Sequence, residues 1–198
     1  MGTNRLEAFS DGVLAIIITI MVLELRVPHE TDIAALRELW PVFVSYVLSF
    51  IYVGIYWNNH HHMLQVTQTV SASVLWANLH LLFWISLLPF STGWLGENQF
   101  AAMPTFFYGL NLLLCAAAYT LLERRIITVD GDTSRLARAL RHDHKGQLSL
   151  VLYVVGLLIA WYWVAWVGLL FFAAVAMLWL IPDKRIEREA KREEVKEA

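Results

Sequence analysis

The sequence has a single cysteine, Cys115, which excludes an intrachain disulfide. Its long apolar stretches contain no Lys or Arg, which excludes a voltage-sensing helix. The G-x-S-x-G nucleophile elbow, the G-x-x-x-x-G-K-[ST] phosphate loop and the H-E-x-x-H zinc motif are also missing. The common signatures of hydrolases, nucleotide-binding proteins and metalloproteases are therefore absent. We see no internal repeat or low-complexity linker, which predicts one domain.

Apolar residues are abundant instead, because 58% of the 198 residues are hydrophobic and Trp, Phe and Tyr contribute 9, 10 and 7 of them. A soluble domain of this size would expose too much apolar surface, so we predict an all-α integral membrane protein. A membrane-crossing helix needs roughly 20 apolar residues. Four runs meet this length, at residues 6–25, 40–58, 73–92 and 103–122.

The last apolar run extends from Leu148 to Ile181, 34 residues without a charge. One helix of that length would be about 51 Å long, too long for a hydrocarbon core of about 30 Å. We therefore predict two short helices, at 148–161 and 164–181, with a turn near Trp161–Trp163 at the membrane interface. The sequence thus predicts six transmembrane helices within residues 1–182.

Basic residues predict the orientation. One precedes the first helix, six lie at 123–147 and six follow Pro182, whereas two lie between the first two helices. Because cytosolic segments are enriched in Lys and Arg, both termini are expected in the cytosol. Residues 183–198 mix six acids with six bases, and we expect a charged cytosolic helix that extends the last span.

Polar residues cluster at the cytosolic ends of the first three predicted helices. A charge inside a span usually faces the bundle interior and has a partner, so Asp11 is expected to pair with His60, His61 or His80, with Arg5 close by. Ser10 and Asn78 can complete the hydrogen-bond network. The residues that we expect at this depth are Arg5, Phe9, Ser10, Asp11, His60, His61, His62, Asn78 and His80.

Two other motifs have alternative interpretations. His60–His62 suggest a metal, but neighbours on a helix point about 100° apart, so at most two could join His80. We favour a structural network and expect no metal site. The stretch 91–96, STGWLG, lacks the T-x-G-[YF]-G order of a carbonyl potassium filter and is predicted to be an interfacial turn.

The segment RLEAFSDGVLAI, residues 5–16, resembles the R-x-x-x-F-S-D signature of the transmembrane protein 175 family, the endolysosomal potassium channels and their prokaryotic relatives. GIYWNNHHHM (54–63) and WANLHLLFWISLLPF (76–90) are also similar to that family. The resemblance implies a modestly selective potassium channel of a prokaryotic plasma membrane, without a carbonyl filter. It implies a homotetramer in lipid that conducts K⁺, with no cofactor, enzymatic activity or nucleic-acid partner.

The resemblance further implies that four copies of the first helix line the pore, with the narrowest ring at Ile16 and a hydroxyl layer at Thr19. Helical spacing agrees, because Ile16, Ile20 and Leu23 recur at i, i+4 and i+7 and Thr19 borders this stripe. Tight hydrophobic rings can gate by dewetting. Glu24 could attract cations at the outer mouth, or it could pair with Arg26.

Three competing interpretations remain open. The Ile/Leu stripe of the first helix could simply pack against other helices. A secondary transporter would use broken helices near the midplane and an inverted repeat, and neither is visible in the sequence. A histidine-liganded membrane oxidoreductase would need a metal or chromophore, which absorption spectra and elemental analysis would detect.

Overall fold

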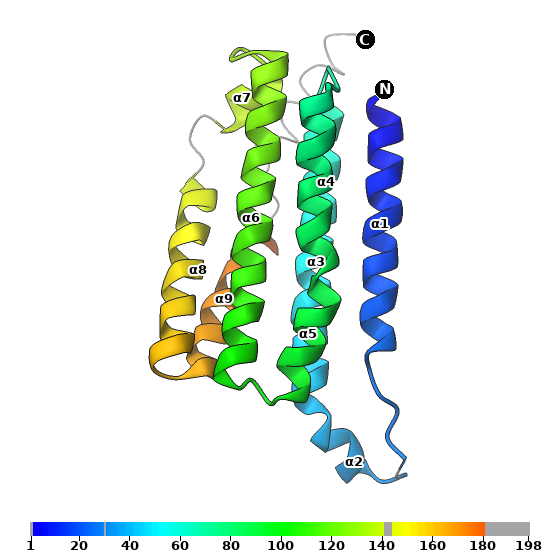
Figure 1. Ribbon diagram of the computed structural model, residues 1–198, viewed down its shortest axis with the longest axis vertical. Coiled ribbons are helices and arrows are strands. Elements are labelled where there is room, and N and C mark those ends of the chain that lie inside the picture. The colour runs from blue at the N-terminus through cyan, green and yellow to red at the C-terminus, as the bar shows by residue number, and fades with distance from the viewer. Residues whose placement is uncertain (1, 30, 141–143, 181–198) are drawn as a thin grey trace.

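The computed structural model describes residues 2–29, 31–140 and 144–180, and within these residues it is helical and contains no strand (Figure 1). The helices are α1 Thr3–Leu23, α2 Ile33–Glu38, α3 Trp40–Val66, α4 Ala72–Ser86, α5 Leu88–Glu97, α6 Ala102–Asp130, α7 Arg135–Leu140, α8 His144–Tyr162 and α9 Ala165–Leu180.

The long helices lie side by side in a bundle, with α1 at one edge and the α8–α9 hairpin at the other (Figure 1). The start of α1, the α3–α4 turn and α7 lie at one end, called here the N-terminal end. The short helix α2 projects from the opposite end, called the α2 end. α6 lies in the middle and packs against α4, α5, α8 and α9, so it forms the centre of the core.

Local sequence explains where several helices begin. The Asp32 carboxylate accepts a hydrogen bond from the Ala35 N–H at the start of α2, and the Ser71 hydroxyl accepts one from the Val74 N–H at the start of α4. Pro41 and Pro89 lie in the first turns of α3 and α5, where a missing N–H costs no helical hydrogen bond.

The predicted turn at residues 91–96 is wrong, because these residues lie inside α5. Pro89 starts a new helix, and Leu87 keeps a helical backbone between α4 and α5. Gly96 lets α5 approach α3 closely, since a Cβ there would lie 2.8 Å from the Val42 Cα. The glycines that suggested a turn are thus tolerated within a packed helix.

Several helices are longer than their apolar runs. α3 continues to Val66 rather than ending near residue 58, and α6 continues to Asp130 rather than 122. The expected 123–147 loop therefore contains the end of α6 and the short helix α7. Polar residues can extend a helix past the membrane core, because backbone hydrogen bonds continue in water. The predicted extension at 183–198 lies outside the described residues.

Five of the described helical segments are long and apolar enough to cross a membrane: α1, α3, α4 with α5, α6 and α8. The sixth predicted span corresponds to α9, an apolar helix of 16 residues. α8 ends at Tyr162 and α9 starts at Ala165, so the charge-free run folds into two helices joined by a tight turn.

The α1 outer face and its polar cluster

Helix α1 has two faces of different character. Its inner face packs against α3, α4 and α5. The buried residues of this face recur every three or four positions, as expected for one side of a helix, and are Leu6, Ser10, Leu14, Ile17 and Met21. Ile16 and Ile17, adjacent in sequence, therefore have opposite environments, with 59% and 3% of their surfaces exposed.

The outer face of α1 carries the four residues that were predicted to line a pore. Ile20 and Leu23 are exposed like Ile16, so the described residues leave most of this stripe open. Thr19 is exposed as well, and its hydroxyl donates to the Ile16 carbonyl at 2.8 Å. Because the proton is used inside the helix, the oxygen lone pairs of Thr19 remain available on the outer face.

A buried hydrogen-bond chain joins α1, α4 and α3 near the N-terminal end. The Asn78 amide nitrogen donates to the Ser10 hydroxyl at 2.9 Å, and that hydroxyl donates to the Leu6 carbonyl. The Asn78 oxygen therefore remains to accept from the His60 Nε2–H, at 2.7 Å. All three side chains are buried. The structure thus joins three members of the predicted network and anchors α1 to the bundle.

A second pair, which the sequence analysis missed, lies beside this chain. The His61 Nδ1 contacts the Glu7 carboxylate at 2.5 Å, and the Gln65 side chain contacts the other ring nitrogen at 2.9 Å. Glu7 lies one helical turn before Asp11, and this i, i+4 spacing was the available signal. The pair joins the start of α1 to the end of α3.

Among the described residues of one chain, Asp11 does not form the expected hydrogen bond with His60, His61 or His80. Glu7 is the partner of His61, Asn78 is the partner of His60, and His80 accepts from the Trp84 indole at 3.0 Å. Among the described residues, no group donates a hydrogen bond to Asp11, and its Oδ1 atom is buried. The reason is geometric, since consecutive residues point about 100° apart and Ser10 occupies the inner face.

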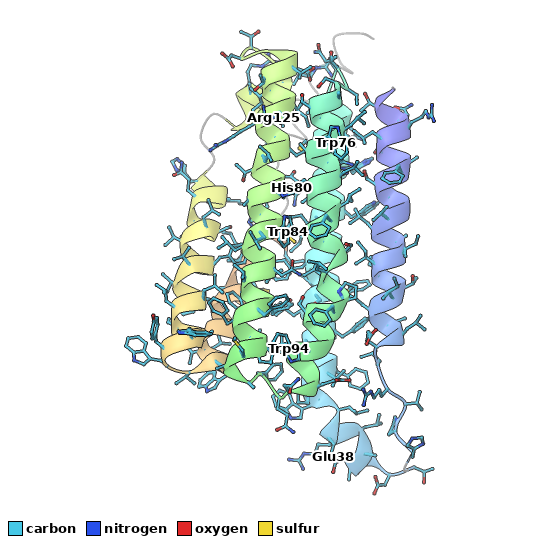
Figure 2. All side chains as sticks on the ribbon, viewed as in Figure 1. Glu38, Trp76, His80, Trp84, Trp94 and Arg125 are labelled. Carbon is cyan, nitrogen blue, oxygen red and sulfur yellow. The ribbon has the colours of Figure 1, made fainter. Side chains whose placement is uncertain are left out.

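Arg5 and Phe9 were also expected in the network, but both are exposed on the outer side of α1. Figure 2 shows Trp76, His80 and Trp84 along α4, with His80 on the surface of the bundle rather than in its interior. Within the described residues, no three His, Cys, Asp or Glu side chains lie close enough together to hold a metal ion.

An open groove of ≈ 690 Å³ runs beside α1 toward the α2 end. Glu24 lines it, and Arg26 pairs across it with Glu97 at 2.8 Å. One alternative was that Glu24 pairs with Arg26, but Arg26 pairs with Glu97 instead. Apolar side chains of α1 and α5 form most of the groove, including Val13, Ile16, Ile20, Pro89, Phe90 and Trp94.

A bundle whose described residues form several apolar helices of membrane-crossing length is the architecture of a multi-pass membrane protein. Residues 5–89 match the family model described as "Endosomal/lysosomal potassium channel TMEM175". A potassium channel of Chryseobacterium sp. (strain P1-3) is 51% identical over 191 residues, covering 96% of this chain and 99% of that protein. The chain belongs to the TMEM175 family.

Two further relatives extend the comparison. The crystal structure of a lysosomal potassium-selective channel TMEM175 homologue from Chamaesiphon minutus superposes with a TM-score of 0.78 and 26% identity, over 91% of this chain and 97% of that one. The endosomal/lysosomal proton channel TMEM175 of Homo sapiens is 36% identical over 96 residues, which cover 42% of this chain and 19% of that protein.

Proposed function

We propose that this protein is a potassium channel whose pore is lined by α1 from four copies of the chain. The observation that carries the proposal is the outer face of α1, where Ile16, Thr19, Ile20 and Leu23 are all exposed among the described residues. The names of the bacterial relatives support K⁺ as the permeant ion. These relatives are channels, so the protein is not an enzyme, and the oxidoreductase interpretation is discarded.

The hydrophobic rings supply the gate. Four Ile16 side chains, which are β-branched and stiff, would form a narrow collar around the axis. When the collar is tight, water leaves it and the barrier to ions is high, whereas slight dilation wets it. The Thr19 oxygens lie one turn further along and can replace part of the water that a K⁺ ion loses. Na⁺ holds its water more tightly, so it is disfavoured.

The buried chain of Ser10, Asn78 and His60 has a mechanical role in this proposal. It fixes the inner face of α1 against α3 and α4, so the outer face keeps one rotation about the helix axis. A ring of four such helices then presents the same residues to the pore. Glu24, in the groove at the α2 end, would raise the cation concentration near one mouth.

Charge favours one orientation in a plasma membrane. Arg124, Arg125, Arg135 and Arg138 all lie at the N-terminal end of the bundle. By the positive-inside rule this end would face the cytosol, and the α2 end would face outward. The polar cluster of α1 then lies at the cytosolic entrance of the pore.

The test is ion flux through the purified full-length protein in liposomes, measured for K⁺, Na⁺ and H⁺ in parallel. We expect K⁺ flux that exceeds Na⁺ flux, rises without saturation at millimolar K⁺, and comes from particles with the native mass of four chains. Empty liposomes and liposomes with heat-unfolded protein are the controls. Saturable flux that depends on a second, coupled ion would support a transporter and contradict the proposal.

A further inference from the structure

We infer that one flank of α1 packs, in the neighbouring copy, against the outer face of α4 and α5. This contact supplies the hydrogen-bond partner that Asp11 lacks among the described residues of its own chain. The inference rests on the proposed ring of copies and assigns the surfaces that form it. The occupant of both surfaces is a second copy of this chain.

Depth in the membrane gives the register. Within one chain α1 and α4 run in the same direction (Figure 1), and the Asn78 side chain donates to Ser10, so these two residues lie at one depth. Each residue advances about 1.5 Å along either helix. Rotation about the membrane normal does not change depth, so in a ring the groups that meet between copies also lie at one depth.

The two surfaces carry matching patterns. On α1 the small residues Ala8 and Ala15 are exposed and separated by seven positions, and the next exposed position in this series is Val22. On α4 and α5 the exposed Trp and Phe residues are also separated by seven positions, with Leu79 exposed between the first two. Those residues are Trp76, Phe83 and Phe90, with 74%, 54% and 61% of their surfaces exposed.

The register pairs each small residue with a large one. Ser10 and Asn78 lie at one depth, Ala15 lies five residues after Ser10, and Phe83 lies five residues after Asn78. Ala15 and Phe83 therefore also share a depth. By the same count Ala8 matches Trp76, and Val22 matches Phe90. A seven-residue repeat of small positions facing a seven-residue repeat of large ones is the pattern by which parallel helices interlock. If this flank of α1 faced lipid instead, shallow gaps would remain beside each alanine.

Asp11 lies on this flank, between Ala8 and Ala15. A carboxylate that is partly buried in a membrane helix needs a donor, and none of the described residues of its own chain provides one. On the opposing face, the Trp76 indole N–H has no partner among those residues. His80 accepts from Trp84 at Nε2, so in its neutral form the proton lies on Nδ1 and is free to donate.

Both donors lie within one helical turn of the depth of Asp11. The contact therefore satisfies three requirements at once: it fills the spaces beside the alanines, it covers an exposed aromatic face and it brings donors to an unpaired acceptor. It also seats the α1 of one copy in the groove beside the α1 of the next, where Phe90 borders Ile16 and Ile20. The outer stripes of successive copies then face a common axis.

Disulfide cross-linking between two differently tagged chains tests the contact in membranes. One chain carries Ala15→Cys and the other carries Phe83→Cys, while the native Cys115 is buried and does not interfere. A disulfide requires Cα atoms closer than about 7 Å. We expect a heterodimer band on mild oxidation. The control pairs Ala15→Cys with Phe90→Cys, displaced by about 10.5 Å, and should cross-link severalfold less.

A size exchange provides a second readout. Ala15→Phe should reduce the tetramer fraction, and the combination of Ala15→Phe with Phe83→Ala should restore it. The inference is overturned if the Ala15→Phe tetramer is as stable as the wild type and the matched cysteine pair does not cross-link. Lipid would then cover this flank, and the proposal of a four-copy pore would be unaffected. A wild-type chain that is monomeric by native mass would overturn the pore proposal itself.

Discussion

Helices α1 and α8 lie at opposite edges of the bundle and are buried to the same extent, because 28% of the most apolar stretch of each is covered within the chain. Their exposed faces nevertheless differ in chemistry. The face of α8 is formed by large apolar residues at helical spacing, namely Leu148, Val151, Val154, Leu158 and Trp161. The face of α1 includes small and polar side chains among its isoleucines, namely Asp11, Gly12, Ala15, Ile16, Thr19 and Ile20.

The difference teaches that hydropathy alone does not identify a lipid-facing helix. The apolar stretch of α1 has a mean hydropathy of 2.1 against 1.4 for α8, so the more apolar helix has the more polar exposed face. Lipid offers no hydrogen bonds, and small or polar residues in membrane helices concentrate where helices meet or where water enters. We therefore interpret the exposed face of α8 as a lipid surface and that of α1 as a surface for neighbouring copies and ions.

The two helices are also anchored differently, which leads to the largest expected effect. Asn78 links α1 to α3 through two buried hydrogen bonds, whereas Ser149 of α8 accepts one bond, from the Trp179 indole at 2.8 Å. Asn78→Ala leaves the His60 N–H without a partner and should lower the free energy of unfolding by about 2–3 kcal/mol. Ser149→Ala should cost about 1 kcal/mol.

Unfolding of both variants is measured in one detergent, by denaturant titration of tryptophan fluorescence. Asn78→Asp serves as a further variant, because it keeps the shape but replaces the amide N–H donors by a carboxylate oxygen in a buried position. Equal losses for Asn78→Ala and Ser149→Ala would show that the buried chain is no stronger an anchor than an ordinary single bond, and the fixed rotation of α1 would lose its physical basis.

The second prediction distinguishes the two exposed faces directly. Ile16→Asn should wet the proposed collar and raise K⁺ conductance about tenfold, equivalent to about 1.4 kcal/mol of barrier, while loosening selectivity. Val154→Asn places the same amide on the exposed face of α8, where we expect a cost of about 1–3 kcal/mol in stability and unchanged permeation. Flux per folded tetramer is the measurement, and similar conductance changes in both variants would argue against a pore at α1.

The extent to which the sequence predicted this molecule differs between its parts. Long apolar runs predicted the helical membrane fold, since a membrane-crossing segment is nearly defined by its own composition. The basic residues predicted only the orientation, which stays a prediction. Boundaries were less predictable where helices continue into water, as at Val66 and Asp130. The 91–96 segment was misjudged because glycine and serine suggest a turn unless a neighbouring helix packs closely on them.

The polar cluster illustrates a different limit. Shared depth predicted that Ser10, Asn78 and His60 would lie close together, and they do. Depth does not give rotation about the helix axis, so the sequence could not tell that Glu7, rather than Asp11, would form the hydrogen bond with His61. The side of α1 that faces the bundle follows from packing against α3 and α4, and this information is distributed over distant parts of the chain.

The smallest effect concerns one hydroxyl. Thr19→Val removes the oxygen from the outer face of α1 and preserves its shape, so assembly should be unchanged. Val151→Thr is the reciprocal change on the exposed face of α8, where a threonine hydroxyl can bond back to its own helix. If the Thr19 oxygen replaces part of the K⁺ hydration, Thr19→Val should lower the K⁺/Na⁺ flux ratio about twofold, equivalent to about 0.4 kcal/mol.

Val151→Thr should leave that ratio at the wild-type value, because its hydroxyl faces lipid in our interpretation. The comparison is made on reversal potentials in bilayers, which do not depend on how much channel is present. An unchanged ratio in both variants would mean that dehydration at the Ile16 collar, without help from Thr19, sets the selectivity. A change in both would mean that the two exposed faces are not distinct, since permeation would then respond to a side chain that no pore at α1 could reach.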